Sequence, residues 1–318
     1  MVAAVPEPDH VLASMMTPRP LLCVVVPARN ERLNIRFFYD RARAALAELS
    51  ELDWNVVFVN NDSADGTLEA MQELRAADDR VKIITLSRNF GYHSALMAGL
   101  SSVEGDYYAI IDVDCEDPPE LLVELYRAIQ GGAQLAYGER SKRDEPRVVT
   151  FGRKLFYLAN RSVADSEIVM WMGEFSIMTR QVRDALLIPQ TSFMSVRAEM
   201  GYAGFPRVGI PYLRERRTHG ESHYNLPRMV TYAILSILSG TTFPLRLVSY
   251  IAAFVSLAYP AVVFGMHLTT VAAGSVAAIV SLYFLVATVP LISLYLARVY
   301  KNGVGRPLFL IDKSRTSL

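Results

Sequence analysis

Between residues 21 and 138, short apolar runs alternate with segments in which apolar residues recur at helical spacing. The apolar runs have the length of strands and lack polar alternation, which is typical of strands covered on both faces. The pattern predicts strands over residues 21–27, 54–60, 81–86, 106–112 and 133–138, and helices over residues 31–49, 64–77, 92–103 and 118–132. Strands that alternate with helices predict an α/β fold, a mainly parallel sheet flanked by helices.

The C-terminal third has a different pattern. From Leu247 to Ala297 the sequence contains no Asp, Glu, Lys or Arg. A membrane-spanning helix needs about 20 apolar residues, so this stretch fits a hairpin of two transmembrane helices with a turn near residues 265–275. Arg246 precedes the hairpin and Arg298 follows it, whereas the turn has no basic residue, so both ends are expected in the cytoplasm. A buried helical hairpin in a soluble core is the alternative.

These patterns divide the chain into five parts. Residues 1–20 contain acids and prolines and no apolar core, so we expect a loose N-terminal tail and not a signal peptide. The remaining parts are the α/β domain, a juxtamembrane amphipathic segment at the bilayer interface, the two transmembrane helices and a C-terminal tail, assigned to residues 21–225, 226–245, 246–298 and 299–318.

Composition narrows the partners and the compartment. The chain has 32 basic and 32 acidic residues, and this balance gives no sign of nucleic-acid binding. Its two cysteines, Cys23 and Cys115, have no metal-site spacing, which fits a reducing compartment and not a disulfide scaffold.

Polar clusters follow the first four predicted strands. They read PARNE, NNDSADGT, SRNFG and DVDCED, at residues 27–31, 60–67, 87–91 and 112–117. In parallel sheets, ligands bind outside the carboxyl ends of the strands, so four clusters at one edge favour a ligand site. Asp62 and Ser63 would also serve as N-caps of the following helix.

The last cluster concentrates negative charge in Asp112, Asp114, Glu116 and Asp117. Close carboxylates repel one another, and a divalent cation removes that conflict. Asp112 and Asp114 are two residues apart at a strand end, and oxygen ligands suit Mg²⁺ or Mn²⁺. Because Mg²⁺ usually completes its coordination with water and phosphate oxygens, the pair predicts a diphosphate ligand. Asp117 precedes Pro118 and fits a helix N-cap better than a metal ligand.

Two common nucleotide sites are disfavoured. The sequence contains no G-x-x-x-x-G-K-[ST] loop, and no G-x-G-x-x-G follows the first strand. A P-loop NTPase and a dinucleotide-binding dehydrogenase are therefore not expected.

Seven stretches, in order from residue 24 to residue 247, resemble the family 2 glycosyltransferases of the GT-A fold. They are VVVPARNE, VNNDSADGT, LSRNFGYHSALMAGL, DVDCEDPPELL, GEFSIMTR, RERRTHGESHY and PLRL. With two spans after them, the chain is most similar to the polyprenyl-phosphate glycosyltransferases, which include dolichol-phosphate mannose synthases and bactoprenol glucosyltransferases.

This resemblance implies roles for individual residues. Asp112 would bind the nucleotide and take part in catalysis, Asp114 would ligate the metal, and Glu116 would add a third carboxylate to it. Glu174 stands where relatives have a catalytic Asp, in GEFS where they have GDFR. The nucleotide base and ribose would be lined by Pro27, Asn30, Glu31 and Asp62.

The acceptor implied by the resemblance is a polyprenyl phosphate such as undecaprenyl phosphate. Arginine forks suit phosphate groups. The residues expected to bind the acceptor phosphate are Arg140, Arg214, Arg217, Ser222 and Tyr224. Because a phosphate monoester is mostly a dianion near neutral pH, Glu174 is expected to orient it more than to deprotonate it.

The sequence leaves several points open. A transferase acting on a hydroxyl or polysaccharide acceptor would usually carry more spans and a Gln-x-x-Arg-Trp motif, which is absent. A catalytically inactive membrane scaffold of the same fold is a further alternative, against which the intact Asp112 and Asp114 argue. A uridine donor is favoured over a guanosine donor, the sugar is unassigned, and homo-oligomerisation stays open. The expected location is the inner (plasma) membrane, with the catalytic domain and both termini cytoplasmic.

Overall fold

The computed structural model describes residues 18–140, 172–188, 195–217, 242–265 and 270–318. In this part of the chain a sheet of seven strands has the order β3-β2-β1-β4-β6-β5-β7. The strands are β1 Leu21–Ala28, β2 Asp53–Asn60, β3 Val81–Thr85, β4 Tyr107–Ile110, β5 Leu135–Arg140, β6 Met172–Thr179 and β7 Arg207–Tyr212. Only β6 is antiparallel to its neighbours, β4 and β5, so the predicted mainly parallel sheet is confirmed.

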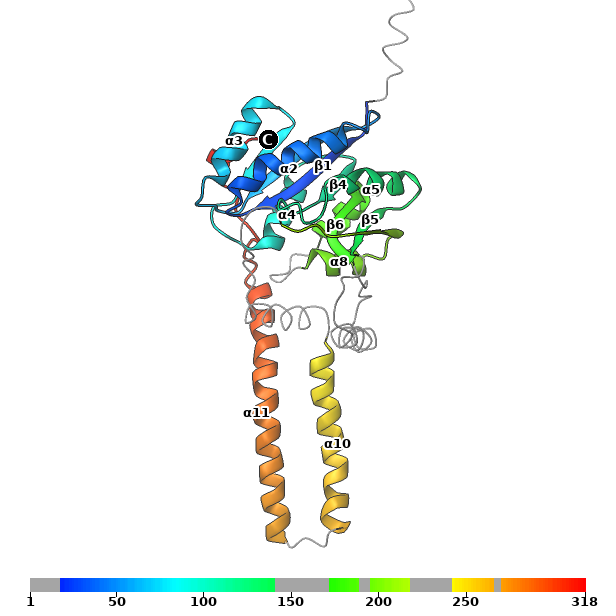
Figure 1. Ribbon diagram of the computed structural model, residues 1–318. Coiled ribbons are helices and arrows are strands. Elements are labelled where there is room, and N and C mark those ends of the chain that lie inside the picture. Colours follow the sequence, from blue (N-terminus) through cyan, green and yellow to red (C-terminus); the bar gives the residue numbers. More distant parts are fainter. Residues whose placement is uncertain (1–17, 141–171, 189–194, 218–241, 266–269) are drawn as a thin grey trace, which may run out of the picture.

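Helices cover both faces of this sheet (Figure 1). One face carries α2 Arg32–Leu46, α3 Thr67–Ala77 and α5 Leu121–Gln130, and the other carries α4 Tyr92–Ser102, α7 Arg180–Leu187 and α8 Val196–Tyr202. Alternate residues of β1 point into the two resulting cores: Val24 belongs to the first cluster and Val25 to the second, and both are fully buried. This two-sided burial is why the strands are continuously apolar.

Helix α4 lies unusually close to the sheet because of Gly99. A Cβ atom at this position would lie 2.3 Å from Cγ1 of Val25 and 3.0 Å from Cγ2 of Val59. Only glycine avoids this clash, so the helix backbone rests directly on β1 and β2. The first turn of α4 is thereby held at the carboxyl edge of the sheet.

The helix starts differ from the predicted ones at two places. Helix α3 begins at Thr67, because Asp62 and Gly66 have left-handed backbone conformations, with φ of 59° and 90°. Its N-cap residue is Gly66, and Asp65 accepts a hydrogen bond from the Thr67 amide at 3.1 Å. Asp62 and Ser63 therefore do not cap this helix.

The second difference concerns Asp117, whose predicted role as a helix N-cap is wrong. Helix α5 begins at Leu121, and its cap residue, Glu120, makes no capping hydrogen bond through its side chain. The carboxylate of Asp117 instead accepts a hydrogen bond from the hydroxyl of Tyr212 on β7. The buried carboxylate thus joins the loop after β4 to the far edge of the sheet.

Two long apolar helices extend away from the α/β domain (Figure 1). They are α10 Phe243–Gly265 and α11 Thr270–Gly303. Both are long and apolar enough to cross a membrane, and their apolar windows are 0% and 6% buried. Burial this low does not fit the alternative of a hairpin inside a soluble core. The predicted amphipathic segment spans residues 226–245. Its residues 226–241 lie outside the described residues, and α10 begins at Phe243, within its last residues.

The C-terminal residues return to the sheet. Ser317 forms a reciprocal pair of backbone hydrogen bonds with Ile83 of β3, at 2.7 and 2.8 Å. Closer to the helix, Ser87 donates its amide to the carbonyl of Leu310 at 2.9 Å, and Ile311 packs against the second core cluster. Sequence reasoning treats residues 299–318 only as a tail, whereas here their last part lines the outer edge of β3. We call residues 310–317 the C-terminal clip.

Candidate active site

Three of the four polar clusters predicted to meet at one edge of the sheet are joined to one another by hydrogen bonds. The Asn30 amide donates to Oγ of Ser63 at 3.1 Å, and Oδ1 of Asn30 accepts the Ala64 amide at 2.9 Å. The loop after β2 continues the chain of contacts, because Oδ1 of Asn61 accepts the Phe90 amide at 3.0 Å. These bonds join the loops after β1, β2 and β3 into one floor.

The predicted nucleotide residues occupy different parts of this floor. Asn30 and Asp62 are exposed and have left-handed backbones, which Asn and Asp tolerate better than other side chains. Glu31 is half-buried, with its amide bonded to the hydroxyl of Thr67 at 2.9 Å. Pro27 is buried near the end of β1, where it pairs with Val59 of β2, so it supports the site without being exposed in it.

The stretch after β4 places its carboxylates on one side of the chain. Residues 111–116 alternate in burial, with Val113 and Cys115 packed in the core and Asp112, Asp114 and Glu116 partly accessible. Cys115 has a φ of 54°, which bends the chain at this point. Because Val113 and Cys115 are packed in the core, the alternation directs the three acidic side chains toward the site.

Asp112 is the most perturbed of these carboxyl groups. Burial raises its pKa to about 7, with further increases from the charges of Asp114, Glu174 and Asp117, while a hydrogen bond from Tyr92 opposes the shift. The Tyr92 hydroxyl donates that bond to Oδ1 of Asp112 at 2.7 Å. A carboxyl group in this state holds a proton or a cation readily near neutral pH.

Glu174 lies on β6, the strand next to β4, and its carboxylate is near Tyr92 and His93. Its carboxylate lies 3.7 Å from Nδ1 of His93 and, with Asp112, raises the pKa of Tyr92, for which burial is the largest cause. Nδ1 of His93 is shielded from solvent and has no hydrogen-bond partner in the described part of the chain. Sequence reasoning missed Tyr92 and His93 as site residues, although both stand in the stretch GYHSALMAGL that carries the family resemblance.

The arginines predicted to bind the acceptor are paired with site carboxylates. Arg217 bonds to Glu31 and has a second carboxylate, Asp114, at 3.9 Å. Arg214 contacts Oε2 of Glu116 at 2.7 Å and Oδ1 of Asp117 at 3.2 Å.

Arg140 follows the same pattern, with Asp117 at 3.3 Å. The crowded negative charge of the sequence is thus balanced by cations from β5 and from the segment after β7. Ser222 and Tyr224, the other residues predicted to bind the acceptor, lie outside the described residues.

The proposed metal ligands can be tested against this geometry. Within the described residues no group of three or more His, Cys, Asp or Glu side chains is arranged to hold a metal ion. Glu116 is paired with Arg214 at 2.7 Å, and its place in the predicted three-carboxylate set stays a prediction. Asp112 and Asp114 remain, and two carboxylates fit an ion that takes its other ligands from water and phosphate.

Comparison with known proteins identifies the family of the chain. The model of the glycosyl transferase family 2 matches residues 23–200. A glycosyltransferase of uncharacterized function from Bacillus subtilis, YkcC, is 31% identical over 304 residues, covering 92% of this chain and 93% of that protein. The bactoprenol glucosyl transferase of Shigella phage SfX is 32% identical over 310 residues, covering 92% and 99%.

Among solved structures, a mannosyltransferase from Pyrobaculum calidifontis in complex with GDP-Man and Mn²⁺ is 17% identical, covers 84% of this chain and 81% of its own, and has a TM-score of 0.48. A likeness at that level leaves the donor and the metal of the present chain undetermined. The family match covers more than half of the sequence and contains most of β1, all of β2 to β6, and Asp112, Asp114 and Glu174. The chain belongs to glycosyl transferase family 2.

Proposed function

We propose that the protein is a membrane-embedded transferase that moves a sugar from a nucleotide donor, UDP-linked in our preferred assignment, to a polyprenyl phosphate. The observation that carries the proposal is the meeting of Asp112 and Glu174 around Tyr92, directly above the carboxyl end of β4. Relatives named bactoprenol glucosyl transferase, similar over nearly their whole length, support a lipid phosphate acceptor.

The reaction is a single displacement at the anomeric carbon, with inversion. A phosphate oxygen of the acceptor forms the new bond to that carbon, and the bond to the nucleoside diphosphate breaks, with the electron pair leaving on the diphosphate. Because the acceptor phosphate is mostly a dianion near neutral pH, it needs orientation more than deprotonation. Glu174, half-buried beside His93, is placed to fix the orientation of the acceptor.

Asp112 and Asp114 would hold Mg²⁺ or Mn²⁺, which would neutralise charge on the leaving diphosphate. The residues of the chain itself prepare this step. Tyr92 fixes Asp112 by its hydrogen bond, and Arg217 links Glu31 to Asp114 across the floor of the site. This linkage would couple the nucleotide end of the site to the metal end.

Membrane insertion of α10 and α11 brings donor and acceptor together. The nucleotide sugar is soluble, whereas the acceptor phosphate stays at the bilayer surface. With the α/β domain, Arg246 and Lys301 on the cytoplasmic side, the site lies above the leaflet that contains the acceptor. This topology places both termini in the cytoplasm.

The test uses the full chain purified in detergent with Mn²⁺ or Mg²⁺, undecaprenyl phosphate and a panel of labelled nucleotide sugars that begins with UDP-glucose. Label that moves into the organic phase, and is lost on addition of a chelator, is the expected result and also names the sugar. Nucleotide binding without labelled lipid from any donor would overturn the proposal, in favour of another acceptor or of an inactive scaffold.

A further inference from the structure

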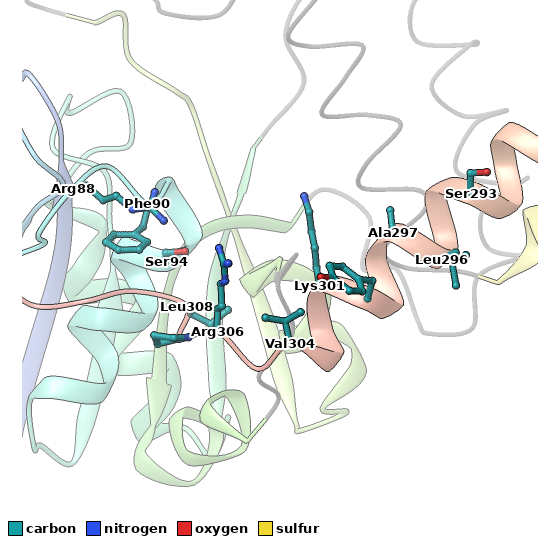
Figure 2. A pocket seen from close by; sticks show the side chains of 12 residues that line it. Arg88, Phe90, Ser94, Ser293, Leu296, Ala297, Lys301, Val304, Arg306 and Leu308 are labelled. Atoms are coloured by element: carbon teal, nitrogen blue, oxygen red, sulfur yellow. The ribbon is translucent and has the colours of Figure 1, made fainter.

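A cavity of about 900 Å³ lies between the end of α11 and the turn that leads into α4 (Figure 2). One wall comes from α11 and the segment after it, and the opposite wall from Arg88, Phe90 and Ser94. None of the lining residues is assigned a role in catalysis or binding from the sequence, although Arg88 and Phe90 belong to the polar cluster after β3. The cavity is nevertheless a direct neighbour of the site, because Tyr92 and His93, which reach the catalytic carboxylates, stand in the same turn as Ser94.

The cavity combines three cations with apolar walls. Arg88, Lys301 and Arg306 line it, and Figure 2 shows Lys301 and Arg306 extending to the same side. The apolar part of the lining consists of Leu296, Ala297, Val304, Pro307 and Leu308, with Phe90 opposite. A ligand that matches this lining has a negatively charged head and an apolar body.

The cations of the cavity differ from those of the site floor in their partners. Arg214 and Arg217 are each held by carboxylates. In the described part of the chain neither Arg88 nor Arg306 forms an ion pair with a carboxylate, and the Arg88 guanidinium stacks on the Phe90 ring at 3.9 Å from its centroid. An arginine supported by an aromatic ring, without a competing acid, suits phosphate.

The position of the cavity along α11 adds a second argument. The candidate spanning part of this helix runs from Gly274 to Gly303, so residues 293–301 of the lining occupy its last turns. In a chain that spans the bilayer, these turns lie at the depth of the lipid phosphates. The cavity therefore opens where an amphiphile can enter with its chain still in the membrane.

We propose that this cavity receives the phosphate of the lipid acceptor, with Arg88 and Arg306 binding the phosphate and the apolar wall of α11 contacting the first prenyl units. The inference rests on the proposed function and adds a position for the acceptor outside the floor arginines. From the cavity, the first turn of α4 leads the phosphate toward Glu174 and Asp112.

The experiment measures binding of a fluorescent short-chain polyprenyl phosphate to the full chain in phosphatidylcholine nanodiscs, without donor or metal. The variants Arg88→Gln and Arg306→Gln, which change exposed side chains, are compared with Lys313→Gln, which removes a similar charge from the C-terminal clip outside the cavity. Each cavity variant is expected to raise the Kd about tenfold, as for loss of one charge-assisted hydrogen bond, and Lys313→Gln to leave it unchanged. In the transfer assay the KM for the acceptor rises equally, while the KM for the donor stays constant.

The outcomes separate this inference from the proposed function. If the double cavity variant binds the probe as tightly as the parent, the cavity is not the acceptor site, even where sugar transfer is normal. Displacement of the probe by excess phosphatidylglycerol or by inorganic phosphate would also overturn the inference, because the cavity would then be a general anionic-lipid or free-phosphate site. If the parent binds the probe through Arg88 and Arg306 but transfers no sugar, the proposed function fails and the lipid-phosphate site stands.

Discussion

The hydroxyl of Tyr92 donates a hydrogen bond of 2.7 Å to the carboxylate of Asp112, and this contact joins the first turn of α4 to the end of β4. Each partner changes the other: the hydrogen bond lowers the pKa of Asp112, while the carboxylate raises the pKa of Tyr92. The tyrosine therefore stays protonated and keeps donating its hydrogen bond to Asp112 near neutral pH.

Metal binding is expected to depend on pH through Asp112. Its pKa in the folded chain is about 7, so below that pH a proton must leave before the carboxylate can ligate an ion. Mn²⁺ affinity should rise about tenfold per pH unit below pH 7 and level off above it. Metal titration of the purified chain between acidic and alkaline pH measures this, and Asp112→Asn should remove both the slope and most of the affinity.

Asp112 is also expected to make stability depend on pH, but in the opposite direction: metal affinity rises with pH, whereas its contribution to the free energy of unfolding falls. Because its pKa is raised from the ordinary 3.8 to about 7, the folded chain binds the proton more tightly than the unfolded chain. The contribution of Asp112 to the free energy of unfolding is therefore greatest below pH 3.8 and is lost as the pH rises toward 7 without metal. Added Mn²⁺ should restore it.

Tyr92→Phe is expected to shift the pH profile. Removing the hydroxyl takes away the largest interaction that lowers the pKa of Asp112, so this pKa should rise by about one unit. The pH dependence of Mn²⁺ affinity reports the shift. Tyr107→Phe is the matched control, since its hydroxyl bonds to Gln130 away from the site; an equal shift there would contradict the assignment.

Substitutions of Asp114 and Glu116 are expected to have different effects on sugar transfer. Asp114→Ala should abolish sugar transfer, because only Asp112 would remain as a carboxylate ligand. Glu116→Ala should retain metal-dependent transfer within about tenfold, since this carboxylate is engaged by Arg214 at 2.7 Å. Initial rates over a range of Mn²⁺ concentrations decide the matter, and a loss of metal dependence in Glu116→Ala would restore the three-carboxylate site.

Arg217→Ala is expected to lose sugar transfer while nucleotide binding is retained. The arginine connects Glu31 to Asp114, and without it the two carboxylates repel each other across the floor. Calorimetric titration with UDP and a transfer assay measure the two properties. Arg216→Ala changes the exposed neighbouring residue and should leave both intact; normal transfer by Arg217→Ala would remove this residue from the site.

Gly99→Ala is expected to destabilise the α/β domain by about 1–3 kcal/mol, because its Cβ would overlap Val25 and force α4 off the sheet. Thermal unfolding by circular dichroism measures the loss. Gly303→Ala, at the end of α11 with no atom within 4 Å of the added Cβ, is the control and should change little. An unchanged melting temperature in Gly99→Ala would mean that α4 is free to move away.

Sequence patterns predict the sheet and its flanking helices because continuous apolar strands report burial on both faces, as in residues 21–28. They also predict that Asn30, Asp62 and Asp112 meet at one edge. They do not predict the partners of the charges: Asp117 pairs with Tyr212, 95 residues away, and Arg217 with Glu31, 186 residues away. Such pairs depend on the tertiary arrangement of loops and leave no local periodicity.

The C-terminal clip restricts the orientations that the α/β domain can take relative to α11. A domain attached to a membrane by one linker can tumble, and its site would face the lipid surface only part of the time. Here α11 ends at Gly303, and Leu310 is already bonded to Ser87, just after β3. In a chain that spans the bilayer, this short connection would limit both the height and the tilt of the sheet above the membrane. If the proposed lipid acceptor is correct, such a fixed orientation would make the encounter a search in two dimensions, at a rate set by lateral diffusion of the lipid.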